Sequence, residues 1–328
     1  MIQYHSDRFL AAYVAIEGAQ KARDFYQLCY DAMHRLKAIV AELPTDVGYR
    51  QLESVYISSR DDDKDHFLKE VETLTRYGFP AKYVAEQELL TDYDLVGKHG
   101  IITYEDASLN PHKLIQALHQ QTISRGGLVF GDTHVTEVNK DTADERIRVI
   151  TKAGPVVRAK QVIFCTGYAV SFPAIKQRDI LHSTYSLVTH PIEGELWADE
   201  RMVWDAEEPY LYFRVTEDHR IIAGGFDGDS ETLSDIPTIE QTAEALMSAI
   251  RKYYPPLQAE PVYAWQSVFG VSQDELPFIG PDPAFPGVYY ALGFGGNGTS
   301  YSLAAADILT KLIQGQPHPF AYTVDPSR

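Results

Sequence analysis

The sequence predicts an α/β protein made of two interleaved domains. Near the C-terminus, the apolar run at 288–292 precedes a glycine-rich turn and an alanine-rich amphipathic segment, which is the pattern of a buried parallel strand that leads into a helix. Elsewhere, strand-rich segments alternate with segments that mix strands and helices, and no low-complexity linker separates them. With 328 residues, the chain is long enough to hold two domains and to bury a substantial core.

Helices are predicted from the spacing of apolar residues and from end signals. The segment 9–43 carries apolar residues at helical spacing, Pro44 lies just past its end, and Gly18 is placed to divide it into two helices. Asn110 and Pro111 form a typical helix start, with Asn as the cap and Pro at the first helical position. The predicted helices cover 9–43, 61–77, 111–125, 237–254 and 303–313.

Strands are predicted where apolar and β-branched residues cluster between turn signals. Between 111 and 167 the pattern is a helix, a strand, a meander of about three strands, and a buried strand that ends at Gly167. The predicted strands cover 52–57, 81–84, 101–104, 128–130, 134–138, 146–150, 156–158, 161–167, 183–190, 201–204, 210–215, 221–223, 262–268 and 288–292.

Composition excludes several classes of protein. The formal net charge of −17 disfavours nucleic acid and anionic membranes as partners, because both repel an acidic surface. No run approaches the 18 or so apolar residues that span a bilayer, and the first residues lack the basic and apolar parts of a signal peptide. Cys29 and Cys165 both lie in apolar runs, which predicts buried free thiols in a reducing cytoplasm.

The glycine-rich turn is the strongest functional signal. A strand, a glycine turn and a helix together direct free backbone N–H groups and the positive end of a helix dipole toward one point, where we expect an electron-rich ligand. The spacing Gly293-x-Gly295-x-x-Gly298 matches the dinucleotide fingerprint, but that fingerprint needs a second strand ending in an acidic residue about 20 residues on. Only a helix and a tail follow here, so the turn is predicted to contact a different part of a cofactor.

Four motifs in register resemble one family. They are 165–167 at the end of a strand, the hairpin 210–225, the segment 265–280 and the turn 293–298. Their order and spacing resemble the FAD-dependent D-amino-acid oxidase and glycine oxidase superfamily, and the last motif is most similar to the γ-glutamylputrescine-oxidase-like branch. The resemblance runs over nearly the whole chain.

The resemblance implies a Rossmann-like FAD-binding domain interleaved with an α+β substrate domain on a large mixed sheet. The FAD-binding domain would comprise 1–44, 101–180 and 258–328, and the substrate-binding domain 45–100 and 181–257. Members of the family begin with a strand–helix–strand unit that carries its own G-x-G-x-x-G. No such unit precedes Met1, whose surroundings resemble the segment after it. The chain is therefore expected to be an N-terminally truncated member that binds FAD weakly or not at all.

The resemblance also assigns cofactor-binding residues. In this family the glycine turn faces the pyrimidine edge of the flavin, where reduced flavin carries negative charge. No cysteine lies where some relatives attach flavin covalently, so any FAD is expected to be non-covalent. The implied FAD-binding residues are Gln3, Tyr4, Val135, Thr166, Gly167, Gly293, Phe294, Gly295, Gly296, Asn297, Gly298 and Thr299.

Substrate binding is expected to involve Tyr212, Arg214 and Phe269. In glycine-oxidase-like members the position of Phe269 carries an arginine that grips the substrate carboxylate, so its absence favours an amine or N-substituted substrate. Arg214 is either a replacement cation or the partner of Glu217 or Asp218 across its hairpin, and both interpretations are open.

Tyr210 and Tyr212 are expected on one face of a strand, either lining a substrate pocket or packing the sheet. No catalytic residue is identified. His5 is a weak candidate for a base, because flavins can take hydride directly from a neutral amine.

Metal and hydrolase chemistry find no support in the sequence. No His-x-x-x-His or Cys-x-x-Cys pair occurs, and His182 and His190 flank one strand without ligand spacing. The acidic run 61–65 is interpreted as helix-start chemistry rather than as a metal site, and no Gly-x-Ser-x-Gly elbow is present. A nicotinamide dehydrogenase would need a complete βαβ unit, which is not found.

The predicted function is oxidation of the C–N bond of an amine or amino-acid-like substrate by hydride transfer to flavin N5. Dioxygen or another electron acceptor would then reoxidise the flavin. The alternative is a catalytically silent, FAD-deficient family member that acts as a binding protein or fragment. The oligomeric state is not predicted.

Overall fold

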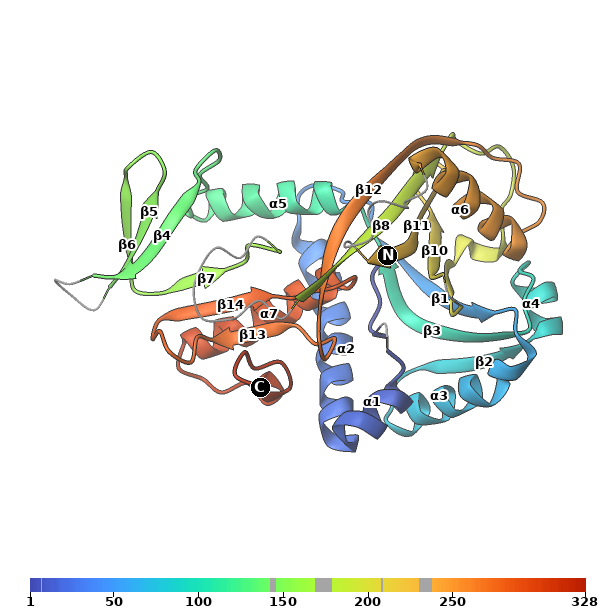
Figure 1. The fold of residues 1–328 in the computed structure, drawn as a ribbon, viewed down its shortest axis with the longest axis horizontal. Coiled ribbons are helices and arrows are strands. Elements are labelled where there is room, and N and C mark those ends of the chain that lie inside the picture. Colours follow the sequence, from blue (N-terminus) through green and yellow to red (C-terminus); the bar gives the residue numbers. More distant parts are fainter. Residues whose placement is uncertain (7, 142–145, 169–178, 208, 230–237) are drawn as a thin grey trace. The chain divides into compact units, whose positions relative to one another are not determined.

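The computed structural model describes residues 1–6, 8–141, 146–168, 179–207, 209–229 and 238–328 (Figure 1). The chain forms two compact units, and neither is a continuous stretch. Unit 1 comprises Met1–Tyr26, Gly48–Leu109 and Leu181–Phe269, and unit 2 comprises Gln27–Val47, Asn110–Ile180 and Gly270–Arg328. Residues 1–26 and 101–109, which we expected in an FAD-binding domain, cluster with the large sheet of unit 1.

Unit 1 is built on an eight-stranded mixed sheet with the strand order β12-β8-β11-β10-β9-β1-β3-β2. The pairing of β1 with β9 is parallel, whereas β10 runs antiparallel to both β9 and β11. The strands are β1 (Arg50–Ser58), β2 (Ala81–Ala85), β3 (His99–Ser108), β8 (Asp179–Thr189), β9 (Met202–Asp205), β10 (Leu211–Val215), β11 (Ile221–Asp229) and β12 (Pro261–Ser272). This large mixed sheet confirms the predicted fold class.

Local signals place the helices close to their predicted ranges. Gly18 separates α1 from α2 and has a φ of 84°, a backbone conformation that glycine adopts without strain. The start of α6 carries a capping box, in which Thr238 accepts from the N–H of Gln241 while the Gln241 side chain accepts from the N–H of Thr238. The helices are α1 (Leu10–Glu17), α2 (Ala19–Glu42), η1 (Asp61–Asp63), α3 (Lys64–Arg76), α4 (Glu86–Asp92), η2 (Ala198–Glu200) and α6 (Ile239–Tyr253).

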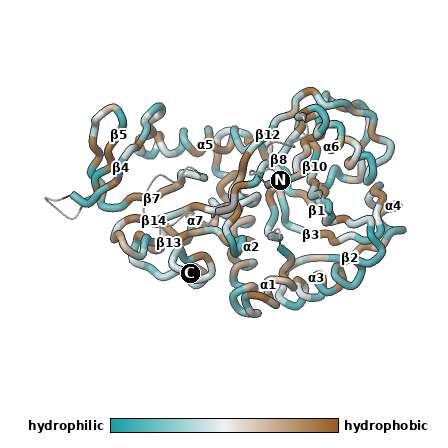
Figure 2. The backbone as a smooth tube through the Cα atoms, viewed as in Figure 1, coloured by the Kyte–Doolittle hydropathy of each residue, from teal (hydrophilic) through white to brown (hydrophobic). Residues whose placement is uncertain are grey.

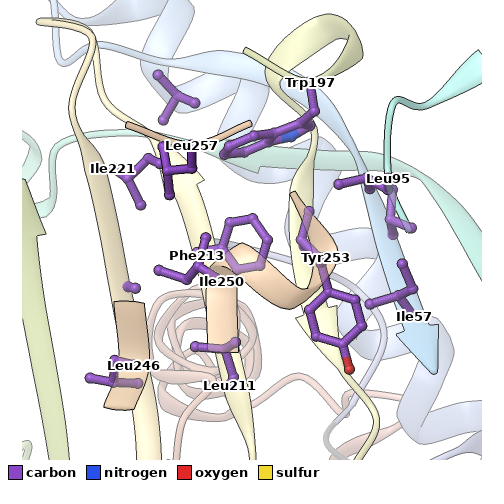
Figure 3. Close-up of a cluster of buried hydrophobic side chains, with 14 of the residues drawn as sticks. Ile57, Leu95, Trp197, Leu211, Phe213, Ile221, Leu246, Ile250, Tyr253 and Leu257 are labelled. Atoms are coloured by element: carbon purple, nitrogen blue, oxygen red, sulfur yellow. The ribbon is translucent and has the colours of Figure 1, made fainter. Parts of the chain in front are cut away.

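The main core of unit 1 lies between one face of the sheet and α6. Figure 3 shows part of it, with Phe213 of β10 beside Ile250 of α6 and below Trp197. The Trp197 and Phe213 rings meet edge to face with centroids 5.1 Å apart, and the Phe213 side chain has no exposed surface. Removing such a ring is expected to cost about 3–5 kcal/mol of stability, because the surrounding structure can close the cavity only in part.

Unit 2 holds two three-stranded sheets. In the sheet β13-β14-β7, β14 runs parallel to β7 and antiparallel to β13, and α7 packs against β13 and β14. The second sheet is the meander β4-β5-β6. The elements are α5 (Pro111–Ser124), β4 (Val135–Lys140), β5 (Ile147–Thr151), β6 (Val156–Ala159), β7 (Val162–Phe164), β13 (Phe278–Pro281), β14 (Val288–Leu292), α7 (Gly298–Ile313) and η4 (Ala321–Thr323).

The cap of α5 forms as predicted, since the Asn110 side chain accepts a hydrogen bond from the N–H of Lys113. No helix within the described part of the chain is long and apolar enough to cross a membrane.

Two predictions about unit 2 are wrong. Residues 128–130 form no strand, and Leu128 and Phe130 are 78% and 69% exposed, so their apolar run does not mark a buried strand. Figure 2 shows the hydropathy of the chain along its backbone. Cys165, the first residue after β7, is exposed rather than buried, whereas Cys29 is buried as predicted.

Candidate functional site

The glycine turn of unit 2 has the predicted strand–turn–helix form. β14 ends at Leu292, and Gly293 and Gly295 then take φ values of 70° and 51°, which glycine adopts at little cost. The N–H of Asn297 donates to the Phe294 carbonyl over 3.1 Å, and α7 begins at the next residue. A Cβ on Gly295 would meet no atom within 4 Å, so the space beside the turn is open.

The open side of the turn suits an electron-rich ligand. The first N–H groups of an α-helix have no acceptor within the helix, and the helix dipole adds partial positive charge at the same end. The turn itself is held in place by Tyr168, whose hydroxyl donates to the Gly295 carbonyl over 3.1 Å, and by the edge-to-face contact of Phe294 with Tyr301. These features fit the electron-rich edge of a flavin ring. Gly296, Gly298 and Thr299 belong to the same turn and helix start.

Thr166 and Gly167 lie at the same edge of the sheet as the glycine turn. They follow the C-terminal end of β7, which pairs in parallel with β14 so that Phe164 lies opposite Tyr290. Ligands of α/β sheets bind beyond the carboxyl ends of the strands. The residues after β7 and the glycine turn after β14 both lie there. Val135 starts β4 and packs against the hydrophobic cluster of β7 and β14.

Gln3 and Tyr4 belong to unit 1, where both are buried against the large sheet. The Gln3 amide donates to the Tyr56 hydroxyl over 2.9 Å, and the Tyr4 N–H donates to an Asp106 carboxyl oxygen over 3.1 Å. Asp106 also accepts from the Thr103 hydroxyl over 2.6 Å. Burial raises the pKa of Asp106 to about 6, although its hydrogen bonds act in the opposite direction.

Tyr212 lies on the sheet face opposite the main core. Together with three neighbouring aromatic residues it forms what we call the aromatic face: Tyr56, Trp204, Tyr210 and Tyr212. The Trp204 ring stacks on Tyr56 at 5.9 Å and lies 5.4 Å from Tyr212, and Tyr210 and Tyr212 are 5.9 Å apart. Tyr210 and Tyr212 therefore share one face, as predicted. Toward β2 and β3 this face is covered by α3, whose Phe67 packs into the same cluster.

The Arg214 side chain lies on the same sheet face as that of Tyr212, because the two residues are two positions apart on β10. Its guanidinium donates to the carbonyls of Val215 and Leu109 over 3.2 and 3.4 Å. Asp218 pairs instead with Arg220 over 2.5 Å, so the alternative pairing of Arg214 with Asp218 is not observed. Glu217, the other alternative, is near enough for its charge to favour the protonated form of Arg214. Burial, and then the nearby charge of Arg50, lower the pKa of Arg214.

Phe269 ends the part of β12 that belongs to unit 1, and its ring lies 5.7 Å from the imidazole of His182 on β8. His182 was considered for a metal role in the sequence, but the structure pairs it with an aromatic ring. No group of three or more His, Cys, Asp or Glu side chains gathers at metal-binding distance among the described residues.

A buried pair that sequence reasoning missed joins His5 to Glu70 of α3. One Glu70 oxygen accepts from the Leu10 N–H over 2.7 Å and contacts His5 Nε2 at 3.0 Å, while the other accepts from the Ala11 N–H over 2.8 Å. Glu70 therefore caps the first turn of α1. Its place in a mainly polar helix predicts an exposed side chain, and only the three-dimensional contact reveals this role.

Comparison with known proteins identifies the family of the chain. A parallel strand pair with a glycine turn at its carboxyl end is a site type of nucleotide cofactors. The model of one family, DAO, described as FAD dependent oxidoreductase, matches residues 4–312. The chain belongs to this family of FAD-dependent oxidoreductases.

Solved structures confirm the fold. L-proline dehydrogenase from P. horikoshii aligns with a TM-score of 0.79 at 18% identity, covering 93% of this chain and 83% of that one. Glycine oxidase from Geobacillus kaustophilus aligns with a TM-score of 0.78 at 17% identity, covering 90% and 80%. In sequence, the chain is 23% identical over 321 residues to the Bacillus subtilis (strain 168) protein YhfW, which is named as a Rieske 2Fe-2S iron-sulfur protein. The chain spans 59% of the length of YhfW.

Proposed function

We propose that this chain binds FAD without a covalent link, in contrast to the weak or absent binding expected from the sequence alone, and that it oxidises the C–N bond of an amine or amino-acid-like substrate. The observation that carries the proposal is the open glycine turn at the start of α7, in a chain whose family is FAD-dependent. Two similar structures are named after amino-acid substrates, as glycine oxidase and as L-proline dehydrogenase. Both oxidations break a C–H bond next to nitrogen, which supports the proposed reaction.

The residues of unit 2 would hold the flavin. FAD, when bound, supplies an acceptor for the hydride that leaves the carbon next to the substrate nitrogen. The N–H groups of the turn 293–298 and the dipole of α7 favour negative charge at the ring edge that they face. Thr166 and Gly167 lie at the same sheet edge and would contact the cofactor from β7. Val135 of β4 is proposed as a further contact, whereas Gln3 and Tyr4 lie in unit 1 and stay predictions from the sequence.

Unit 1 would bind the substrate through Tyr212, Arg214 and Phe269. Phe269 cannot grip a carboxylate, and its ring pairs with His182 instead. An amine or N-substituted substrate therefore fits better than a simple α-amino acid. If the substrate does carry an acidic group, Arg214 is the cation proposed for it. Its guanidinium donates to two backbone carbonyls over 3.2 and 3.4 Å, and Glu217 is the nearby carboxylate with which such a substrate would compete.

The electron acceptor is proposed to be either dioxygen or an iron–sulfur protein. Similarity to YhfW, which is named for a 2Fe-2S cluster, favours the second acceptor. A Rieske cluster needs two cysteines and two histidines, and the two cysteines of this chain differ in burial, since Cys29 is buried and Cys165 exposed. No group of three or more His, Cys, Asp or Glu side chains gathers among the described residues, so the cysteines of this chain are not proposed to hold a cluster.

The test is flavin binding followed by substrate-dependent reduction. Purified protein is incubated with FAD and passed through gel filtration, and the flavin absorbance that stays with the protein is measured. We then expect an amine from an anaerobic substrate panel to bleach that absorbance. A peroxide assay in air identifies dioxygen as the acceptor. Protein that retains flavin but is bleached by no amine or amino acid of the panel would contradict the proposed reaction.

A second candidate is a binding protein that has lost flavin chemistry. The observation that favours it is the exposed apolar surface of unit 2, where Ile123 is 57% exposed in addition to Leu128 and Phe130. Large contiguous apolar surfaces are typical of interaction sites, and these residues are proposed to contribute to one. The same gel-filtration experiment decides between the candidates, because a stoichiometric flavin spectrum would exclude the flavin-free protein.

A further inference from the structure

The hairpin of β5 and β6 in unit 2 is a basic element in an acidic chain. The segment 146–160, which includes β5, β6 and the turn between them, carries five Lys and Arg residues and no Asp or Glu, although the whole chain has a formal net charge of −17. β5 is the central strand of the meander β4-β5-β6 (Figure 1). The hairpin is therefore expected to attract anions that the rest of the chain repels.

Two arginines lie opposite each other on this hairpin. Arg148 of β5 is the register partner of Arg158 of β6 and, on its other side, of Asn139 of β4. Residues opposite each other in an antiparallel pair lie on one face of the sheet with their Cβ atoms about 5 Å apart, and like charges in such positions repel each other. The other face holds Val138 and Ile147, which pack into the hydrophobic cluster of β7 and β14. Arg148 and Arg158 therefore lie on the outer face of the meander, which we call the arginine face.

Arg148 lacks an acceptor for one of its donors. Its Nε is buried and has no hydrogen-bond partner among the described residues. Two carboxylates of the meander have other partners, since Asp141 pairs with Arg158 over 2.7 Å and Glu137 accepts from the Asn139 amide over 2.5 Å. A buried donor without an acceptor is unfavourable, and so is a second arginine opposite it. A ligand that brings acceptor oxygens and negative charge would remove both penalties.

We propose that Arg148 and Arg158 bind a phosphate group on the arginine face. A guanidinium offers a planar fork of N–H donors that fits two oxygens of a phosphate. At pH 7 a phosphate monoester carries a charge of about −1.5 to −2 and three acceptor oxygens, so it matches two guanidiniums better than a carboxylate with a single charge does. The phosphate belongs either to a separate soluble ligand or to the pyrophosphate of FAD, and the experiment below distinguishes these two sources.

The test is a titration of the purified chain with inorganic phosphate, followed by nuclear magnetic resonance of isotope-labelled arginine at constant ionic strength. The Nε–H resonance of Arg148 is assigned as the one that disappears in Arg148→Lys. We expect phosphate to shift this resonance and to slow its hydrogen exchange, because the N–H gains an acceptor. Acetate should bind about tenfold more weakly, since it offers one charge and fewer acceptor oxygens. An Arg148 resonance that phosphate does not shift, or that acetate shifts at equal concentration, would overturn the inference.

A matched pair of variants separates the guanidinium fork from the net charge of the hairpin. Arg148→Lys keeps the charge but loses the fork, and it should weaken phosphate binding about tenfold in isothermal titration calorimetry. Lys152→Gln removes a full charge from an exposed residue in the turn of the same hairpin, and it should weaken binding less. Equal weakening by both variants would reject the site. Thermal unfolding checks that each variant folds, and the resonance titration of the parent keeps the test valid should Arg148→Lys fail to fold.

Titrations with FAD and riboflavin distinguish the two sources of the phosphate. If the site binds a separate ligand, FAD leaves the Arg148 resonance unshifted, and Arg148→Lys retains as much flavin after gel filtration as the parent does. If the site binds the pyrophosphate of FAD, FAD shifts the resonance, riboflavin does not, and the variant retains less flavin. These readouts do not depend on amine oxidation, so phosphate binding at Arg148 in a chain that oxidises no amine would keep this inference and reject the proposed reaction.

Discussion

Single residues decide how the N-terminal segment is attached to unit 1. Glu70 accepts two backbone N–H groups of α1 and contacts His5, and Asp106 accepts the N–H of Tyr4. Both carboxyl side chains are fully buried. Because a buried donor without an acceptor costs more than a hydrogen bond gains, these two acids hold the backbone at Tyr4, Leu10 and Ala11 in place.

Glu70→Gln is expected to lower the free energy of unfolding by about 1–3 kcal/mol, since the neutral amide cannot accept from both N–H groups with its two terminal atoms. Urea denaturation measures the change. Glu72→Gln on the same helix is the control, because the Glu72 side chain is 68% exposed and pairs only with Arg76. An equal loss in both variants would contradict the capping role of Glu70.

Asp106 makes the stability of unit 1 depend on pH. Its pKa in the folded chain, about 6, lies above its ordinary value of 3.8, so the folded state holds the proton more strongly than the unfolded state. The stabilising contribution is complete below pH 3.8 and is lost as the pH rises through 6. Relative to the parent, Asp106→Asn should therefore gain roughly 2–3 kcal/mol between pH 4 and pH 7.5. Denaturation of both proteins at the two pH values measures this, and a pH-independent difference would refute it.

At the scale of elements, end signals were easier to predict than contacts between distant segments. Gly18 and the Asn110 cap mark the helix ends correctly, because a helix end depends on a few neighbouring residues. The glycine turn at 293–298 was predictable for the same reason. The buried role of Glu70 and the partner of Asp218 were not, because they depend on which segments meet in the fold.

Gly18→Ala should lower stability by about 1–3 kcal/mol, because alanine would be forced to a φ of 84° with a ψ of 155°. Space is not the cause, since a Cβ there meets no atom within 4 Å. Gly131→Ala is the matched control, with open space and no positive φ. Thermal unfolding compares the two, and a neutral Gly18→Ala would show that the break between α1 and α2 tolerates a side chain.

At the scale of the whole molecule, the family and fold were predictable because four motifs recur in the right order over most of the chain. The exposed apolar surface was not predictable, because the apolar residues 128–130 indicate a buried strand when only their residue types are considered. Their exposure in the structure is a property of the packed unit, and no local signal in the sequence reports it.

Leu128→Ser combined with Phe130→Ser should reduce self-association of the chain and its binding of an apolar dye, with little change in melting temperature, because both side chains are exposed. Sedimentation velocity over a range of concentrations measures the association. Ile16→Ser, at a residue that is 62% exposed elsewhere on the chain, is the control. Unchanged association in the double variant would show that this apolar run does not mediate self-association.

The interleaving of the two units has a consequence for synthesis of the chain. The sheet of unit 1 pairs Ser54 with Met202 and still needs β12, and the β7–β14 pair of unit 2 joins residue 162 to residue 288. A growing polypeptide can therefore complete neither core until most of it has left the ribosome. During that interval the apolar strands remain unpaired. Long-range pairing of this kind is slow, and a chain with unpaired apolar strands is prone to aggregation. Production of this protein is thus expected to depend on temperature and on chaperone capacity more than production of a protein with sequential domains does.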